Sequence, residues 1–198
     1  MGDITAAFLN VEMKAEDPDV GLEFPRDTTT QAEFYVDASF MSEGPEGVTS
    51  RAGYCGWLQP RDTHGPSGFF CAYSKAIKAV PLSTPDAELR ALTECIRECI
   101  RTRGLLEEMG APQLHPTPIG EDNQGAYGYA HNEKLTENSK HVRLQQQFVN
   151  FHQREGTADV WQVPTIVEWA DQLTKTLKPT EFIRQLEVLL GHTGVPRE

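Results

Sequence analysis

Two acidic residues lie where an unpaired charge would destabilise a folded chain. Asp37 stands in the middle of residues 34–40, where apolar and polar side chains alternate as in a half-buried strand. Glu88 precedes Leu92 by four residues and therefore lies on the apolar stripe of a predicted helix. A buried carboxylate is costly unless a cation or hydrogen-bond donors compensate for it. Both positions therefore predict a specific partner for the acid.

Two further acids, Asp122 and Asp171, follow predicted strands and open predicted helices. Functional groups in open α/β sheets gather at the carboxyl ends of strands, so these acids can meet Asp37 and Glu88 there. Carboxylates in one pocket repel each other unless cations lie between them. Oxygen ligands select Mg²⁺ or Mn²⁺. Two such ions, about 3.5–4 Å apart, stabilise the attacking and leaving oxygens when a phosphodiester is cut.

Each acid also has a purely structural interpretation. Asp37 could form an ion pair with an arginine such as Arg51, and Glu88 could be stabilised by the helix dipole in a first turn. Asp122 or Asp171, taken alone, would be interpreted as a helix cap. The four acids together, on the order of elements described next, favour a metal centre over separate structural roles.

The elements that must position these acids follow from hydrophobic periodicity and turn residues. Thr84 and Pro85 suit the cap and the first position of the longest helix, which should end by Gly110. The expected strands are residues 34–40, 52–58, 68–74, 117–121 and 159–163, and the expected helices are residues 84–110, 123–131, 140–154, 167–177 and 180–190.

This order of elements predicts an α/β fold with a five-stranded mixed sheet. The first three strands should form an antiparallel meander, the fourth and fifth should run parallel to the first, and helices should flank the sheet. We expect one domain over residues 33–191 and a short tail at 192–198. Residues 1–32, rich in acidic residues, Pro and Thr, are expected to form a disordered or poorly ordered tail.

The composition bounds the partners and the compartment. The chain has 198 residues and a net charge of −11, which counts against the basic face of a strong nucleic-acid binder but not against a metal-dependent nuclease. No apolar run approaches the roughly 20 residues of a membrane span, and the N-terminus lacks a signal-peptide pattern. We expect a cytoplasmic or nuclear monomer that is neither membrane-bound nor secreted. The cysteines are expected as buried thiols, although the spacing of Cys95 and Cys99 could also suit one metal.

The segments around the four acids resemble the ribonuclease H domain of copia-type retrotransposon Pol polyproteins. The resemblance covers roughly residues 33–191 and rests on short motifs that occur in the same order. The motifs are Phe34-Tyr35-Val36-Asp37-Ala38, Ser50-Arg51-Ala52-Gly53-Tyr54, residues 82–92, Glu121-Asp122-Asn123-Gln124-Gly125-Ala126, Ser139-Lys140-His141 and Ala170-Asp171-Gln172-Leu173-Thr174-Lys175.

The resemblance implies a ribonuclease H-like fold and a metal-dependent endoribonuclease that cleaves the RNA strand of RNA–DNA hybrids. It implies that Asp37, Glu88, Asp122 and Asp171 are catalytic and hold two Mg²⁺ or Mn²⁺ ions. It further implies that nucleic acid is contacted by Asn123, Gln124, Lys140, His141 and Lys175. Asp3-Ile4-Thr5-Ala6-Ala7-Phe8-Leu9-Asn10 is similar to the first catalytic-aspartate motif of the reverse transcriptase of the same elements, and we interpret it as a remnant without chemistry.

The chain departs from the family around His141. The family tends to His-Ser-Arg before Ser139 and to Ile-Asp-x-Arg after His141, whereas this chain has Thr136-Glu137-Asn138 and Val142-Arg143-Leu144-Gln145. The interpretation of His141 as a packed helix residue is favoured over a catalytic one. The basic residues left near the predicted site are Lys75, Lys78, Lys134, Lys140, Arg143 and Lys175. We therefore expect the hybrid to be bound weakly and cut slowly.

Two other functions compete with the active nuclease. The first is a relic that keeps the fold, has little or no activity, and acts as a nucleic-acid or protein binding module; the low basic content favours it. The second is another member of the same superfold, such as an exonuclease or an integrase-like domain. The three-strand meander and the pattern of acids favour ribonuclease H.

Overall fold

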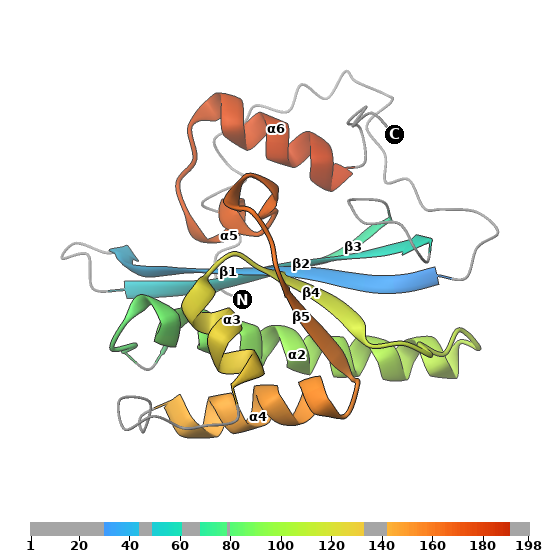
Figure 1. Ribbon diagram of the computed structural model, residues 1–198. Coiled ribbons are helices and arrows are strands. Elements are labelled where there is room, and N and C mark those ends of the chain that lie inside the picture. Colours follow the sequence, from blue (N-terminus) through green and yellow to red (C-terminus); the bar gives the residue numbers. More distant parts are fainter. Residues whose placement is uncertain (1–29, 44–48, 61–67, 79, 133–141, 191–198) are drawn as a thin grey trace, which may run out of the picture.

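The computed structural model describes residues 30–43, 49–60, 68–78, 80–132 and 142–190. Five strands form one sheet of order β3-β2-β1-β4-β5 (Figure 1). The strands β1 and β2, and β2 and β3, pair antiparallel, whereas β4 is parallel to β1 and β5 is parallel to β4. The strands are β1 (Thr30–Glu43), β2 (Thr49–Pro60), β3 (Phe69–Ala76), β4 (Thr117–Glu121) and β5 (Ala158–Gln162). The predicted five-stranded mixed sheet, with an antiparallel meander followed by two parallel strands, is confirmed.

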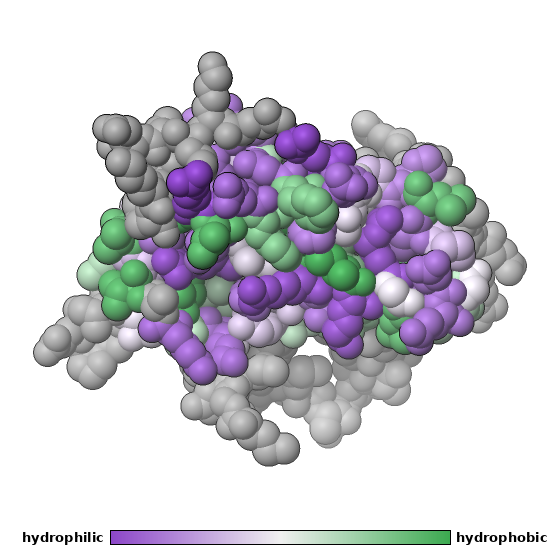
Figure 2. All heavy atoms as spheres, turned by 90° about the horizontal axis from the view of Figure 1, so that it is seen from below, coloured by the Kyte–Doolittle hydropathy of each residue, from purple (hydrophilic) through white to green (hydrophobic). Residues whose placement is uncertain are grey.

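Helices cover both faces of this sheet. Figure 1 places α2, α3 and α4 below the sheet and α5 and α6 above it. The helices are α2 (Thr84–Glu108), α3 (Gln124–His131), α4 (Arg143–Arg154), α5 (Asp171–Thr174) and α6 (Pro179–Leu190), and η2 (Thr165–Val167) is a single 3₁₀ turn. The face seen in Figure 2 is mainly hydrophilic, with exposed hydrophobic side chains in separate areas. No helix among the described residues is long and apolar enough to cross a membrane.

The central strand β1 supplies both apolar cores. Phe34 and Val36 are fully buried in the cluster that includes the apolar face of α2, and Tyr35 is buried in the second cluster, beneath α5 and α6. Burying one large apolar side chain contributes about 1.5–3 kcal/mol to the stability of the fold. A shift of one residue would turn these side chains to the opposite face, so the alternation fixes the register of the strand. Asp37 follows this alternation, and its carboxylate accepts hydrogen bonds from Thr174 and Lys175 at the end of α5.

The N-cap of α2 lies one residue earlier than the sequence predicted. Ser83 is its N-cap, with an extended backbone at φ −162° and with its hydroxyl accepting from the backbone N–H of Asp86. Thr84 is already helical, so the prediction that Thr84 caps the helix was wrong. The helix ends before Gly110, whose φ of +82° suits a residue without a side chain, as predicted.

The helix expected at residues 167–177 does not form as one piece. The 3₁₀ turn ends at Val167, and α5 starts only at Asp171. Between them Glu168 has an extended backbone, with ψ 95°, and its side-chain Oε1 accepts from the backbone N–H of Ala170 at 3.0 Å. This local bond replaces a helical one, which explains the break.

The four cysteines are free thiols. Cys55, Cys95 and Cys99 are buried and Cys71 is half-buried. Burial raises the pKa of the Cys99 thiol to about 11. A high pKa keeps such a thiol neutral, so it packs as a small apolar group.

Candidate active site

Three of the four predicted acids converge at one point. Asp37 comes from β1, Glu88 from the first turns of α2, and Asp122 from the residue after β4. One carboxylate oxygen of each lies within 4.8 Å of the corresponding oxygens of the other two. Asp37 and Glu88 are buried, and Asp122 is half-buried. We call Asp37, Glu88 and Asp122 the carboxylate triad; the predicted convergence of these three acids is confirmed.

Asp171 joins the triad through a lysine. The ammonium of Lys175 lies 2.9 Å from Oδ1 of Asp37 and 2.5 Å from Oδ1 of Asp171. Asp171 opens α5 and Lys175 caps its end, so both charges lie on one side of a single helical turn. The fourth acid is therefore brought to the same edge of the sheet, with a cation between it and Asp37.

A glycine allows α5 to approach the sheet beside Asp37. Gly53 of β2 is the direct partner of Asp37 of β1 in the antiparallel register. A Cβ at Gly53 would lie 2.7 Å from Cγ2 of Thr174 and 2.9 Å from Cβ of Leu173, closer than real Cβ contacts. The hydroxyl of Thr174 donates a hydrogen bond to Oδ2 of Asp37. Gly53 thus permits the contact that holds the Asp37 carboxylate in place.

The helix α3 is capped by Asn123 and not by Asp122. Oδ1 of Asn123 accepts from the backbone N–H groups of Gly125, at 2.9 Å, and Ala126, at 3.1 Å. Asn123 is therefore the N-cap, and the interpretation of Asp122 as a helix cap is wrong. This arrangement leaves the carboxylate of Asp122 for the triad.

Two further buried acids near the triad, Glu121 and Glu168, were not predicted from the sequence. Glu121 and Glu168 are fully buried. Oε1 of Glu121 accepts from the backbone N–H of Asn123 at 3.0 Å. Glu121 immediately precedes Asp122, so a strand ending in two adjacent acids was the available signal; Glu168 lay inside an expected helix and gave none.

Burial dominates the electrostatics of the site. It raises the pKa of Glu88 well above its usual range, and the nearby charges of Glu121 and Asp37 add to the effect. Burial likewise raises the pKa values of Glu121 and Glu168. A carboxyl group in this environment keeps its proton unless a cation compensates for its charge.

Lys175 is the cation that the chain itself supplies. Burial opposes its charge, but the carboxylates of Asp37 and Asp171 outweigh burial and raise the pKa of the ammonium. The pKa of Asp171 is nevertheless raised, first by its own burial and in spite of its hydrogen bond with Lys175. One ammonium therefore compensates only part of the acidic charge gathered at this edge.

The residues present fit a divalent cation. Among the described residues, the buried Oε2 atoms of Glu88 and Glu121 have no hydrogen-bond partner. Leaving a buried carboxylate oxygen unpaired is costly, and a metal ion would satisfy it. The donors are all oxygens, which Mg²⁺ and Mn²⁺ prefer. The pair Cys95 and Cys99 is not part of this group of metal-capable side chains.

The expected nucleic-acid contacts lie in different places. Asn123 is engaged in capping α3, and Gln124 is exposed in its first turn. Lys175 is held by two carboxylates within the acidic centre. Lys140 and His141 fall outside the described residues. A contact of these residues with nucleic acid stays a prediction.

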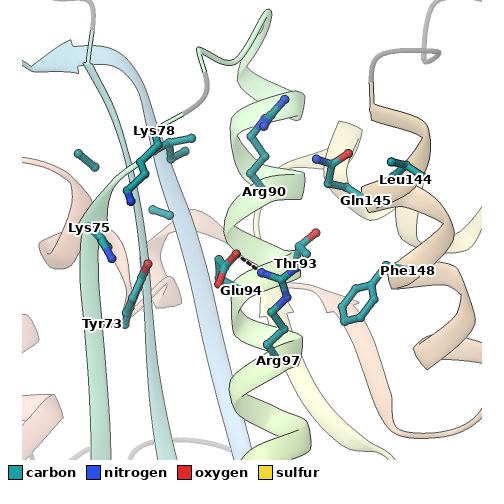
Figure 3. A pocket seen from close by; sticks show the side chains of 13 residues that line it. Tyr73, Lys75, Lys78, Arg90, Thr93, Glu94, Arg97, Leu144, Gln145 and Phe148 are labelled. Atoms are coloured by element: carbon teal, nitrogen blue, oxygen red, sulfur yellow. Dashed lines mark hydrogen bonds and ion pairs between the residues drawn. The ribbon is translucent and has the colours of Figure 1, made fainter.

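A groove rich in cationic groups lies between β3, α2 and α4 (Figure 3). It has a volume of about 570 Å³ and is lined by four basic side chains, Lys75, Lys78, Arg90 and Arg97, and one acidic side chain, Glu94. Arg97 pairs with Glu94 at 2.6 Å, and Arg90 pairs at 2.7 Å with Asp86, outside the lining. The two lysines were predicted from the sequence as basic residues near the site, whereas the two arginines were not, although their spacing of seven on α2 puts both on one face.

Comparisons with known proteins agree with the resemblance seen in the sequence. No family model matches the chain. It is 30% identical over 165 residues to the retrovirus-related Pol polyprotein from transposon RE2 of Arabidopsis thaliana, covering 83% of this chain. It is 29% identical over 179 residues to the corresponding polyprotein from transposon RE1, covering 90% of this chain. The chain spans only 11% and 12% of the length of these two relatives.

A ribonuclease H1 from the halophilic archaeon Halobacterium salinarum NRC-1 is a structural neighbour. The overlap has a TM-score of 0.49 and 17% sequence identity, and it covers 72% of this chain and 93% of the archaeal one. The sheet order and register given above, rather than this overlap, define the fold. The predicted resemblance to retrotransposon Pol polyproteins is confirmed; the segment interpreted as a reverse transcriptase remnant lies outside the described residues.

Proposed function

We propose that this chain is a metal-dependent endoribonuclease of ribonuclease H type that cleaves the RNA strand of RNA–DNA hybrids. The single observation that carries the proposal is the carboxylate triad, in which three acids from β1, α2 and the end of β4 offer oxygens within 4.8 Å. The sequence similarity to retrotransposon Pol polyproteins supports it. The active unit would be the domain over residues 33–191.

The chemistry assigns a role to each acid. The triad and Asp171 would hold two Mg²⁺ or Mn²⁺ ions, which supply an activated water and stabilise the charge on the attacking and leaving oxygens. Asp37 would be a metal ligand at the centre of the site, because it belongs to the triad and also contacts Lys175, which contacts Asp171. Thr174 donates a hydrogen bond to the carboxylate of Asp37 and keeps it oriented, so an ion would bind to an ordered ligand.

The cationic groove would take a phosphate backbone of the hybrid. Lysine and arginine contacts to phosphates dominate nucleic-acid affinity. The acidic partners of Arg90 and Arg97 already offset part of their charge, which leaves Lys75 and Lys78 as the stronger phosphate ligands. With so few cations and a net charge of −11, we expect weak binding with a shallow salt dependence.

The test is cleavage of a hybrid whose RNA strand carries a fluorescent label. The protein should cut this RNA in Mg²⁺ or Mn²⁺ and leave it intact in EDTA, and it should not cut the DNA strand or an RNA duplex. Asp122→Asn and Glu88→Gln should abolish cleavage, whereas Glu107→Gln, an exposed acid on the same helix, should not. A wild-type protein that is folded and binds hybrid without cutting it would favour the inactive relic.

A further inference from the structure

Lys175 extends into the acidic centre from the end of α5. Its ammonium contacts Oδ1 of Asp37 at 2.9 Å and Oδ1 of Asp171 at 2.5 Å. The two acids are shielded from solvent, with side-chain exposures of 0% for Asp37 and 11% for Asp171, while the lysine side chain is 41% exposed. The ammonium of Lys175 is therefore held between two carboxylates, while part of its side chain is exposed to solvent.

Asp37 belongs to two arrangements at once. On one side it completes the carboxylate triad with Glu88 and Asp122. On the other side its oxygens receive bonds from Lys175 and Thr174. We call Asp37, Lys175 and Asp171 the lysine bridge. Asp37 thus joins the triad to the lysine bridge, and of these two groups only the bridge contains an ammonium.

We propose that Lys175 is an internal counter-ion that occupies the place of a second divalent ion, so that this ion binds only when the lysine turns out to solvent. This inference rests on the proposed function. The ammonium makes the contacts with Asp37 and Asp171 that a cation shared by those two carboxylates would make. The ammonium and the second ion would compete for this position, because both would need the same two carboxylates, those of Asp37 and Asp171.

The long stem makes such an exchange feasible. A lysine carries a compact charge on a flexible four-carbon chain, so its ammonium can move without a change of backbone. Asp171 and Asp37 keep a partner in either state, first the ammonium and then the metal ion. The first ion should bind at the triad without displacing Lys175. The second ion should have a lower affinity, because it must displace Lys175.

The first arm of the test counts bound Mn²⁺ on the full chain by electron paramagnetic resonance. Lys175→Met should strengthen binding of the second ion by at least about tenfold, equal to about 1.4 kcal/mol. Lys175→Arg, which keeps the charge, should resemble wild type more than Lys175→Met does. Lys178→Met removes an exposed lysine three residues away and should leave both affinities unchanged.

The second arm measures melting in EDTA. Lys175→Met should lower the melting temperature, because Asp37 and Asp171 lose their cation, and Mn²⁺ should restore it. If this variant does not fold without metal, the double variant Asp171→Asn with Lys175→Met, which removes the charge on both sides, should recover the fold.

The possible failures are distinguishable. Wild-type affinity for both ions in Lys175→Met, together with an unchanged melting temperature in EDTA, would overturn the role of Lys175 and leave the metal centre intact. A wild-type protein that binds no Mn²⁺, alongside a Lys175→Met variant that binds none, would overturn the metal centre as well.

Discussion

The metal-free protein should lose stability as the pH rises towards neutral from about 4.3, the pKa of Glu in an unfolded chain. The cause is a set of buried acids, Glu88, Glu121 and Glu168, whose pKa values are raised chiefly by burial. Such a carboxyl keeps its proton in the folded chain after the unfolded chain has lost it. Its stabilising contribution is complete below the unfolded pKa, about 4.3 for Glu, and is lost as the pH rises through the folded pKa.

The size of the effect follows from proton linkage. Each carboxyl that is protonated only in the folded state lowers the free energy of unfolding by about 1.4 kcal/mol for every pH unit. For a chain of this length, 1 kcal/mol corresponds to about 2–4 °C in melting temperature, so each such acid contributes about 3–6 °C per pH unit. Glu88→Gln replaces one of these acids by a neutral side chain of the same shape and should make the slope shallower by this amount.

The assay is thermal melting in EDTA across this pH range. The matched control is Glu107→Gln, an exposed acid on α2, which should keep the wild-type slope. Adding Mg²⁺ should oppose the loss, because the ion binds ionised carboxylates and its stabilising effect grows with pH. A melting temperature that is constant or rises with pH in EDTA, or an unchanged slope in Glu88→Gln, would refute the reasoning.

Three further changes probe the site and its supports. Gly53→Ala should destabilise the protein by about 1–3 kcal/mol and weaken Mn²⁺ binding, because the new methyl group would push Thr174 away from the sheet. Thermal melting and metal titration measure the two effects, and a wild-type melting curve would contradict the prediction. Asn123→Ala should cost about 1 kcal/mol of stability through the lost cap of α3, measured by denaturant unfolding, and a neutral effect would count against that role. Replacing both Lys75 and Lys78 by Ala should weaken hybrid binding and flatten its dependence on log salt by up to about 0.9 per lost phosphate contact, measured by fluorescence anisotropy at several salt concentrations; an unchanged slope would exclude the groove.

Local periodicity was enough to find most of the fold and the principal acids. The alternation around Asp37 identified a buried acid on the central strand, because a charge inside a strand of large apolar residues stands out against its neighbours. Glu88 was found in the same way from its place on the apolar stripe of α2, where it is 3% exposed. Both conclusions needed only the spacing of nearby residues.

The remaining features depend on contacts between distant parts of the chain. The ion pair of Lys175 with Asp37 joins residues 138 positions apart, and periodicity carries no information on such a contact. The break before α5 depends on one side-chain bond of Glu168 to a backbone N–H, which competes with the helix that the sequence favours. The cationic groove likewise appears only when α2, α4 and β3 are packed together.

The most direct test of the metal centre is anomalous diffraction from a crystal of the protein soaked with Mn²⁺. A peak should lie between the carboxylates of Asp37, Glu88 and Asp122, whose oxygens already approach within 4.8 Å of one another. The same crystal form of Asp122→Asn should lose the peak or show it much weakened. A well-ordered triad with no manganese, or manganese bound only elsewhere on the surface, would contradict the proposal that these acids form the catalytic metal centre.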